Sequence, residues 1–431
     1  MRKFDWRFGL GRQAWAWASY DFANSVFATT VVAGFFPVFL DSYWRGGMSH
    51  AQTFALLAWV NGIVAAAVAL MAPLLGALAD RSARRKRFIG AFLLFGVGGT
   101  AGLAIPGSGA VEVALLLFAL ASIGYAGGNV FYDGLLPHVA AHEKLDRVSA
   151  FGYALGYLGG GLLFALNVWM IEQPHFFGLA DTTAAVKAAF VSAAVWWGLF
   201  ALILFLGVSE DRSGVAPGRA FREGLAQFAI TVKRLRTLPV LAGFLLAYWC
   251  YIDGVNSVFR LAVGFGVSLG LPPADLLVAL LMTQFVAFPA ALGFGRLGEH
   301  LGPRMGITLG LLVYTAVVAY ASFITRPWQF FLLAFLVGLV QGGTQSLSRS
   351  LYARLVPRAE SATFFGFYGM MGKFSAVLGP LLVAITTSAT GSPRLGILAI
   401  VVLFILGLVG LWLLPLGRVQ LARNAKQVTV A

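Results

Sequence analysis

Long apolar stretches recur along almost the whole chain. A helix needs about 20 predominantly apolar residues to cross the hydrocarbon core of a bilayer. Twelve stretches of that kind lie at about 15–40, 53–79, 88–106, 111–136, 149–171, 187–208, 239–266, 274–297, 304–325, 328–351, 362–388 and 394–415. The pattern predicts an all-α polytopic membrane protein with twelve transmembrane helices.

Charged residues are scarce and strongly biased toward the basic. Lys and Arg number 31 against 17 Asp and Glu, although only 11% of the residues are charged. Nucleic-acid binding needs basic residues gathered on a water-facing surface, and an apolar fraction of 59% argues against that function. Most of the basic residues, Arg349 among them, fall in connections on one side, and few fall on the other: Arg45, Lys187, Arg326 and Arg394. The positive-inside rule then predicts cytosolic termini, and we expect the inner (plasma) membrane of a bacterium.

One long connection divides the stretches six and six. The predicted organisation is an N-terminal bundle over 1–208, a cytosolic linker over 209–238 and a C-terminal bundle with a short tail over 239–431. Apolar residues recur every three or four positions in the linker: Phe221, Leu225, Phe228, Val232 and Leu235. This spacing predicts an amphipathic helix on the inner leaflet. It serves either as a plain connection or as a regulatory contact with anionic lipid.

The two halves repeat one another. Residues 17–27 (WASYDFANSVF) match residues 249–259 (WCYIDGVNSVF), so that Asp21 and Asp253 coincide. The turn that begins at Gly76 and contains Asp80 is echoed by the turn that contains Glu299. Parallel repeats of six spans around a midplane site are an architecture of secondary transporters.

The turn after the second stretch resembles the signature between spans 2 and 3 of the major facilitator superfamily. It contains Gly76, Leu78, Asp80, Arg81, Arg84 and Arg85. Further segments are similar to the vacuole-effluxer-like branch of that superfamily: 17–25, 156–160, 341–350, 364–368, 372–373 and 379–380. The resemblance covers nearly the whole chain and implies solute transport by alternating access. The fungal vacuolar members of this branch are linked to amino-acid efflux, whereas bacterial relatives share no firmly known substrate.

Several charges lie inside the apolar stretches, where they normally face a bundle interior and serve function. Asp21 and Asp133 lie toward the inner ends of their stretches, whereas Asp253 and Lys373 lie near the midplane and form the predicted interior charge pair. We expect these residues to recognise substrate charge or to couple transport to protons. A permanent salt bridge between the halves is the structural alternative. Arg260 either binds a carboxylate near the outer mouth or extends to the outer interface.

Polar residues recur on the first, fourth, seventh and tenth stretches. The resemblance implies that these spans line a central cavity, which would suit a small polar solute. The candidate lining residues are Tyr20, Asn24, Asn129, Asn256, Gln341 and Gln345. Hydrogen bonding between helices is the equally plausible structural role.

The Asp80 turn is predicted to form a gate. Asp80 can meet a helix N-terminus or pair with its basic neighbours, and it would thereby stabilise a form closed on the inner side. The candidate gate residues are Asp80, Arg81, Arg84, Arg85 and Glu299. The positive-inside bias alone also accounts for the basic ones.

Other function classes find little support. Cys250 is the single cysteine, and the five histidines lack metal-ligand spacing, so we expect no metal and no cofactor. The sequence shows no nucleophile with a base within reach, so it gives no indication of an enzyme. The open alternatives are a transport-inactive membrane sensor of the same fold and a proton-coupled exporter of drugs or sugars. The expected partners are a small-molecule substrate, the lipid bilayer and protons, with the protein a monomer.

Overall fold

The computed structural model describes residues 10–210, 230–231, 233, 237–268, 273–375 and 378–416. Over these residues the chain is helical and contains no strand. The first half contains α1 (Arg12–Val26), η1 (Phe27–Phe35), α2 (Phe36–Phe39), η2 (Leu40–Trp44), α3 (His50–Ser82), α4 (Arg85–Gly102), α5 (Val111–Val139), η3 (His142–Lys144), α6 (Leu145–Glu172), η4 (Pro174–Phe177) and α7 (Thr182–Gly207). The second half contains α9 (Pro239–Ser268), α10 (Pro273–Leu301), α11 (Pro303–Ala321), α12 (Pro327–Leu355), η5 (Arg358–Glu360), α13 (Ser361–Phe374), α14 (Leu378–Thr390), α15 (Pro393–Leu398) and α16 (Val401–Leu413).

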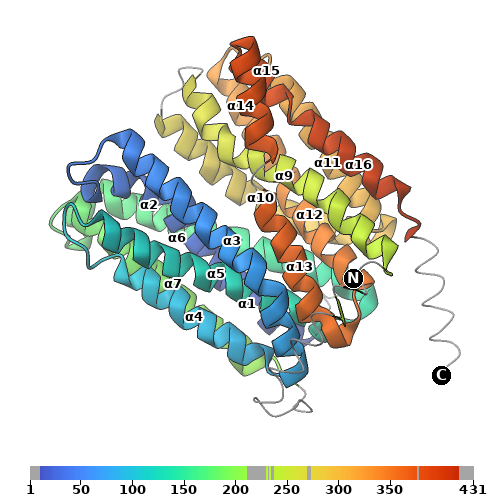
Figure 1. Cartoon of the computed structure of the whole chain (residues 1–431). Helices are drawn as coiled ribbons and strands as arrows, with labels where there is room; N and C mark the ends of the chain where they lie inside the picture. The colour runs from blue at the N-terminus through green and yellow to red at the C-terminus, as the bar shows by residue number, and fades with distance from the viewer. Residues whose placement is uncertain are drawn as a thin grey trace, which may run out of the picture.

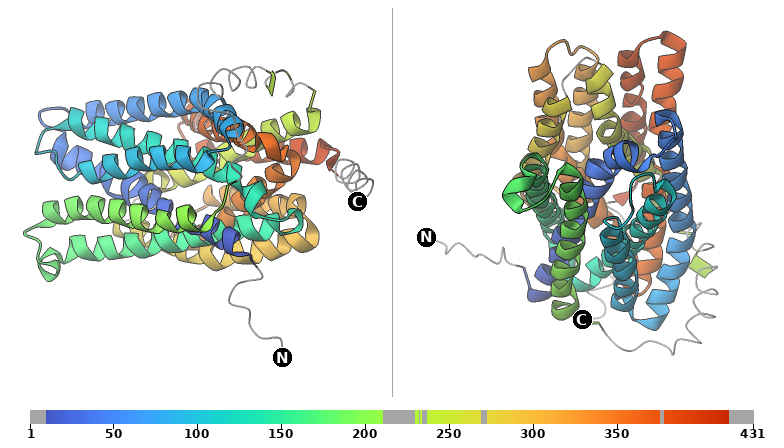
Figure 2. Two further views of the ribbon diagram at one scale, coloured as in Figure 1. Left: turned by 90° about the horizontal axis from the view of Figure 1, so that it is seen from below. Right: turned by 90° about the vertical axis from the view of Figure 1, so that its left-hand side faces the viewer.

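The helices gather in two groups. Those of the first half, blue to green in Figure 1, lie on one side, and those of the second half, yellow to red, lie on the other. Figure 2 shows the same two groups from two further directions. We call them the N-terminal and C-terminal bundles.

The all-α fold is confirmed, because nine helical segments of the described residues are long and apolar enough to cross a membrane. The three predicted stretches not among them, 88–106, 239–266 and 362–388, coincide with α4, with α9 and with the pair α13 and α14. For these three, spanning stays a prediction. All five residues of the apolar stripe predicted in the linker lie outside the described residues.

Local sequence explains where several helices begin and change pitch. Ser49 and Gln52 form a capping box at the start of α3, and the Asp181 side chain caps α7 by accepting a hydrogen bond from the Ala184 backbone nitrogen at 2.8 Å. In the first span, α1 continues into the π-helical η1, and Pro37 then opens α2. Proline lacks an N–H and cannot complete the regular ladder, which is consistent with a change of helical pitch beside it.

The predicted stretch 362–388 is two helices rather than one. Asp253 of α9 accepts hydrogen bonds from the backbone nitrogens of Leu378 (2.9 Å) and Gly379 (2.7 Å), at the start of α14. The first N–H groups of a helix have no partner within it, and a carboxylate there also interacts favourably with the helix dipole. A tertiary contact from the seventh span therefore stabilises the second helix start.

Matching glycines bring the two bundles into contact. A Cβ atom on Gly76 of α3 would lie 2.3 Å from the carbonyl oxygen of Ala362 in α13, and one on Gly295 of α10 would lie 2.6 Å from the Cβ of Ala150 in α6. Gly76 and Gly295 hold equivalent places in the repeated turn. The same close approach thus occurs twice, with the roles of the bundles exchanged.

Both contacts lie at one end of the molecule. Here α3, α5, α10 and α12 end, and α4, α6, α11 and α13 begin. We call this the basic end, because it carries the predicted inner arginines of the α3–α4 turn. In Figure 1, α13 lies alongside α3 toward this end.

Candidate inter-bundle gate and cation cage

Arg349 of α12 is buried between the bundles, with only 2% of its surface exposed. Its Nη1 atom lies 3.0 Å from Asp133 Oδ1, and its Nη2 atom lies 3.2 Å from Asp21 Oδ2. Arg349 also donates to Ser149, from Nε to the hydroxyl oxygen and from Nη2 to the carbonyl oxygen, both at 2.9 Å. All three partners belong to the N-terminal bundle, so one side chain of the C-terminal bundle joins two carboxylates of the other.

Aromatic rings surround the same guanidinium group. The Arg349 Cζ atom lies 4.3 Å from the ring centre of Tyr153 and 4.8 Å from that of Trp17. Cations are attracted to aromatic faces at such distances. Tyr132, at 5.7 Å, stacks on Trp17 and donates a hydrogen bond to Asp21 Oδ2 at 2.7 Å. We define the Arg349 cage as Trp17, Asp21, Tyr132, Asp133, Ser149 and Tyr153.

The prediction that Arg349 lies in a connection on the inner side was wrong. It lies inside α12, in a run in which Ser346, Ser348 and Ser350 are all completely buried. A row of small residues at the end of an apolar stretch indicates close contact with another helix. That signal was present in the sequence, whereas counting basic residues by side treated every helix end as exposed to water.

Asp80 joins the bundles nearer the basic end. It pairs with Arg85 at 2.6 Å and accepts hydrogen bonds from the backbone nitrogens of Ala362 (3.1 Å) and Thr363 (2.8 Å). Asp80 thus meets a helix N-terminus, that of α13, and one of the three predicted arginines. Arg81 is exposed and Arg84 is half-buried.

The repeat provides a second set of contacts on the opposite side of the interface. Glu299 of α10 forms an ion pair with Arg147 of α6. Asp146, also in α6, pairs with Arg354 of α12 at 2.7 Å and accepts a hydrogen bond from Ser350. Glu299 was predicted as a gate residue. No role was predicted for Asp146, Arg147 or Arg354, because their partners come from a distant part of the chain.

Four of the six polar residues predicted to line a cavity form hydrogen bonds with side chains of other elements. Asn24 donates to Asn129 at 2.6 Å within the N-terminal bundle, and Asn256 donates to Ser375 at 2.9 Å within the C-terminal bundle. Gln345 accepts a hydrogen bond from Tyr157 across the interface at 3.3 Å. Two more members are buried: Tyr20 and Gln341. Helix-to-helix hydrogen bonding, the structural alternative, therefore describes several of these side chains in this conformation.

Of the predicted interior charge pair, Asp253 is the member whose side chain the structure describes. Asp253 is completely buried and bonded to the start of α14, with Ser257 donating to it at 3.2 Å. The side chains of Lys373 and Arg260 lie outside the described part of the structure. Asp253 is therefore placed at a helix start, and its pairing with Lys373 stays a prediction.

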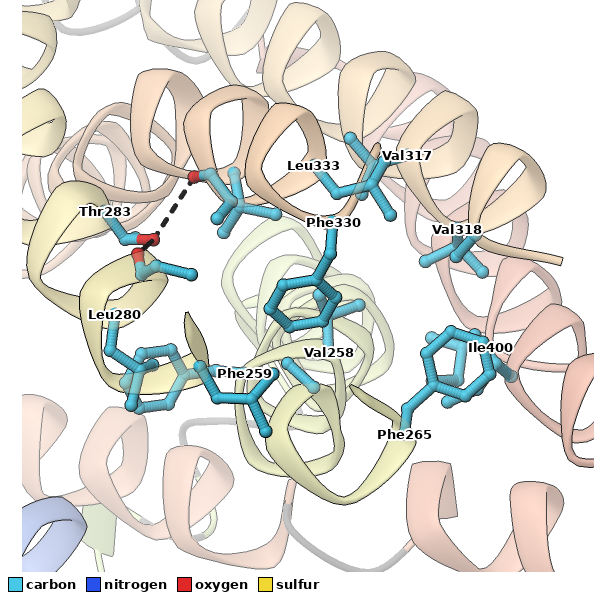
Figure 3. Close-up of a pocket in the computed structure, with 17 residues that line it drawn as sticks. Val258, Phe259, Phe265, Leu280, Thr283, Val317, Val318, Phe330, Leu333 and Ile400 are labelled. Atoms are coloured by element: carbon cyan, nitrogen blue, oxygen red, sulfur yellow. Dashed lines mark hydrogen bonds between the residues drawn. The ribbon is translucent and has the colours of Figure 1, made fainter. Parts of the chain in front are cut away.

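An apolar cavity of about 80 Å³ lies within the C-terminal bundle (Figure 3). Residues of α9, α10, α11, α12 and α15 line it, with Phe259, Phe265 and Phe330 among them. Thr283 is its single hydroxyl-bearing lining residue, and that hydroxyl donates to the carbonyl oxygens of Ala279 and Ala334. A polar solute would find no free partner there. Among the described residues, no group of three or more His, Cys, Asp or Glu side chains is placed to hold a metal ion.

Comparison with known proteins agrees with this architecture. Residues 11–423 match the family described as vacuole effluxer Atg22 like. The chain is 35% identical over 407 residues to the uncharacterized MFS-type transporter YxiO of Bacillus subtilis (strain 168), covering 94% of this chain and 95% of that protein. Autophagy-related protein 22 of Yarrowia lipolytica is 25% identical over 318 residues, which cover 65% of this chain and 53% of that protein.

Solved structures show the same fold. The human organic anion transporter MFSD10 (TETRAN) superposes with a TM-score of 0.74 at 15% identity, over 93% of this chain and 99% of that one. The proton:xylose symporter XylE gives a TM-score of 0.66 at 14% identity, over 94% of both chains. The chain therefore belongs to the Atg22-like vacuole effluxer family, and it is an integral membrane transporter of the major facilitator type and not an enzyme.

Proposed function

We propose that this protein is a secondary active transporter that exchanges a small polar solute, an amino acid in the first instance, by alternating access coupled to protons. The observation that carries the proposal is the Arg349 cage. Asp21 and Asp133 of one bundle share a single arginine of the other, at an interface that must part for alternating access.

Opening the basic end separates charges. The hydrogen-bond partners of the Arg349 guanidinium, Asp21, Asp133 and Ser149, lie in the N-terminal bundle, so the arginine must leave them when the bundles move apart. Two carboxylates would then remain close together without their shared counter-ion. Like charges that share a site disfavour each other's charged form, and such a pair tends to take up a proton. Opening would therefore accompany the binding of one proton by the pair of Asp21 and Asp133, which faces Tyr132, Tyr153 and Arg349 in the closed form.

The solute class rests on chemistry and on kinship. The amide groups of Asn24, Asn129 and Gln345 offer both donors and acceptors near the interface, which suits a zwitterion. Membership of an effluxer family, together with the link of fungal members to amino acids, makes export of amino acids the first hypothesis to test.

We also infer that the basic end faces the cytosol and that the described conformation is closed on that side. The support is the positive-inside bias together with three groups of contacts between the bundles at that end. These are centred on Asp80, on Asp146 and on Arg349. The cytosolic termini, the bundles over 1–208 and 239–431 and the cytosolic linker over 209–238 stay predictions of this proposal.

Flux into proteoliposomes tests the proposal. Uptake of labelled amino acids should be stimulated by a pH gradient in the wild type and in Glu112→Gln, a control in the exposed first turn of α5. The stimulation should be largely lost in Asp21→Asn and Asp133→Asn, because the amide side chain cannot take up a proton. Gradient-driven uptake that persists in both Asn variants would overturn the assignment of proton coupling to this pair.

A further inference from the structure

We propose that the Arg349 cage is a binding site for organic cations, and that a guanidinium group of a small solute occupies it when Arg349 withdraws. In the closed form, Arg349 would then act as a tethered stand-in for that ligand. The inference rests on the proposed function in one respect, since it requires that the basic end opens.

The site is built from one bundle alone. Trp17 and Asp21 come from α1, Tyr132 and Asp133 from α5, and Ser149 and Tyr153 from α6. Arg349 is the single component that comes from α12. Departure of the C-terminal bundle therefore removes the occupant and leaves the walls.

Contacts that do not involve Arg349 hold those walls. Tyr132 donates to Asp21, Trp17 donates through Nε1 to the Tyr132 carbonyl oxygen at 2.8 Å, and the two rings stack at 4.5 Å between centroids. Gly152 leaves room for the occupant, because a Cβ atom there would lie 2.5 Å from Asp21 Oδ2 and 3.0 Å from Arg349 Nη2. The carboxylate and the aromatic wall are preorganised within the N-terminal bundle.

The chemistry of the site selects a planar cation with several N–H groups. Asp21 Oδ2, Asp133 Oδ1 and the Ser149 carbonyl oxygen are all acceptors. The Ser149 hydroxyl donates to the Ser346 carbonyl oxygen and so presents its oxygen to Arg349 Nε. Two carboxylates give the vacated site a net negative charge, and the faces of Trp17 and Tyr153 favour a delocalised cation. An anion would meet the like charge of the two carboxylates.

Arg354 provides a comparison within the same interface. It is also a buried arginine of α12, but its described partners are one carboxylate, Asp146, and the ring of His142. Removing Arg354 would vacate a site that includes the Asp146 carboxylate. Removing Arg349 would vacate one with two carboxylates and an aromatic wall.

The test is chemical rescue of the purified full-length protein. Methylguanidinium chloride should raise the unfolding temperature of Arg349→Ala above the effect of sodium chloride at the same ionic strength. Its apparent affinity should be roughly ten-fold or more tighter than for Arg349→Ala/Asp133→Asn, which lacks one charged acceptor. Arg354→Ala should show no such selective gain. Equal effects of the two salts, or equal affinity in the single and double variants, would overturn the proposal.

A second measurement covers the case in which Arg349→Ala cannot be recovered folded. The protein for this measurement keeps Arg349 and carries Cys250→Ser together with Ala353→Cys, a reporter thiol near the basic end of α12. Methylguanidinium chloride should increase labelling of that thiol several-fold over sodium chloride at the same ionic strength. Unchanged labelling would contradict cation binding in the open form. Both readouts are independent of flux, so failure of the cage as a cation site and failure of proton-coupled transport are separate outcomes.

Discussion

Asp80 of α3 and Thr363 of α13 belong to different bundles, and Asp80 Oδ2 lies 2.8 Å from the Thr363 backbone nitrogen and 2.7 Å from its hydroxyl oxygen. The carboxylate therefore caps a helix across the interface while Arg85 balances its charge. The contact combines a side-chain cap, a helix dipole and an ion pair in one place.

Asp80→Asn should weaken this closure. The amide keeps one acceptor but loses the charge that faces both Arg85 and the start of α13. We expect cysteines introduced at the basic end to label several-fold faster, and cysteines at the opposite end to label more slowly. The measurement is thiol accessibility on a Cys250→Ser background. An unchanged pattern at both ends would remove Asp80 from the gate.

Gly76→Ala should force the same interface apart by steric means. Its Cβ would lie 2.3 Å from the Ala362 carbonyl oxygen, whereas a Cβ on Gly62 in the same helix would meet nothing within 4 Å. Both changes raise helix propensity to a similar degree, so their difference isolates the contact. We expect Gly76→Ala to lower the free energy of unfolding by about 1–3 kcal/mol relative to Gly62→Ala, measured by thermal unfolding in detergent. Equal stability of the two variants would show that α13 yields without cost.

Asp253→Asn should destabilise the start of α14. The carboxylate accepts two backbone N–H groups, and one amide oxygen replaces it poorly. The expected loss is about 1 kcal/mol. Asp181→Asn is the control, since that exposed residue accepts a single N–H and Asn caps equally well. If Asp253→Asn keeps its stability but loses gradient-driven flux, Asp253 serves coupling and not the helix start.

Glu210 gives stability a pH dependence at the end of α7. Burial raises the pKa of the Glu210 carboxyl, and the hydrogen bond that it accepts from the Lys86 backbone nitrogen at 3.1 Å offsets this only in part. A raised pKa in the folded state means that the folded protein holds the proton longer than the unfolded chain does. Its contribution is therefore favourable below the ordinary value of about 4.3 and is lost as pH rises through the folded value.

The corresponding experiment compares the wild type with Glu210→Gln from pH 4 to pH 7. The unfolding temperature of the wild type should fall relative to that of the variant across this range. A difference that stays constant with pH would mean that Glu210 titrates normally in the folded protein.

Periodicity and composition predicted the fold because they report on hydrophobic burial, which the bilayer imposes on whole segments. The break between α13 and α14 escaped prediction for a different reason. It depends on Asp253, a residue more than a hundred positions away that supplies acceptors to a new helix start. The partner of an acidic residue in a distant span has no local signature.

The acidic residues of the site could be predicted from the sequence better than the arginines that pair with them. Asp21, Asp133, Asp80 and Glu299 were each singled out, because charge inside or beside an apolar stretch is conspicuous. The arginines that pair with Asp21, Asp133 and Glu299 were not, since Arg147 lies at a helix end and Arg349 lies in the last two turns of α12, where basic residues are expected in any case. Only the packing of α12 and α6 against each other distinguishes a buried arginine from one that faces water.

The two aspartates at equivalent positions of the repeat differ in whether their contacts cross between the bundles. Asp253 is fixed to backbone groups of its own bundle, whereas Asp21 shares an arginine that belongs to the other. Of these two aspartates, Asp21 is therefore the one that loses an ion pair between the bundles when they separate. A transmembrane voltage acts on any charge that moves through it, so the rate of opening should respond to membrane potential through the N-terminal bundle, even for a solute that carries no net charge.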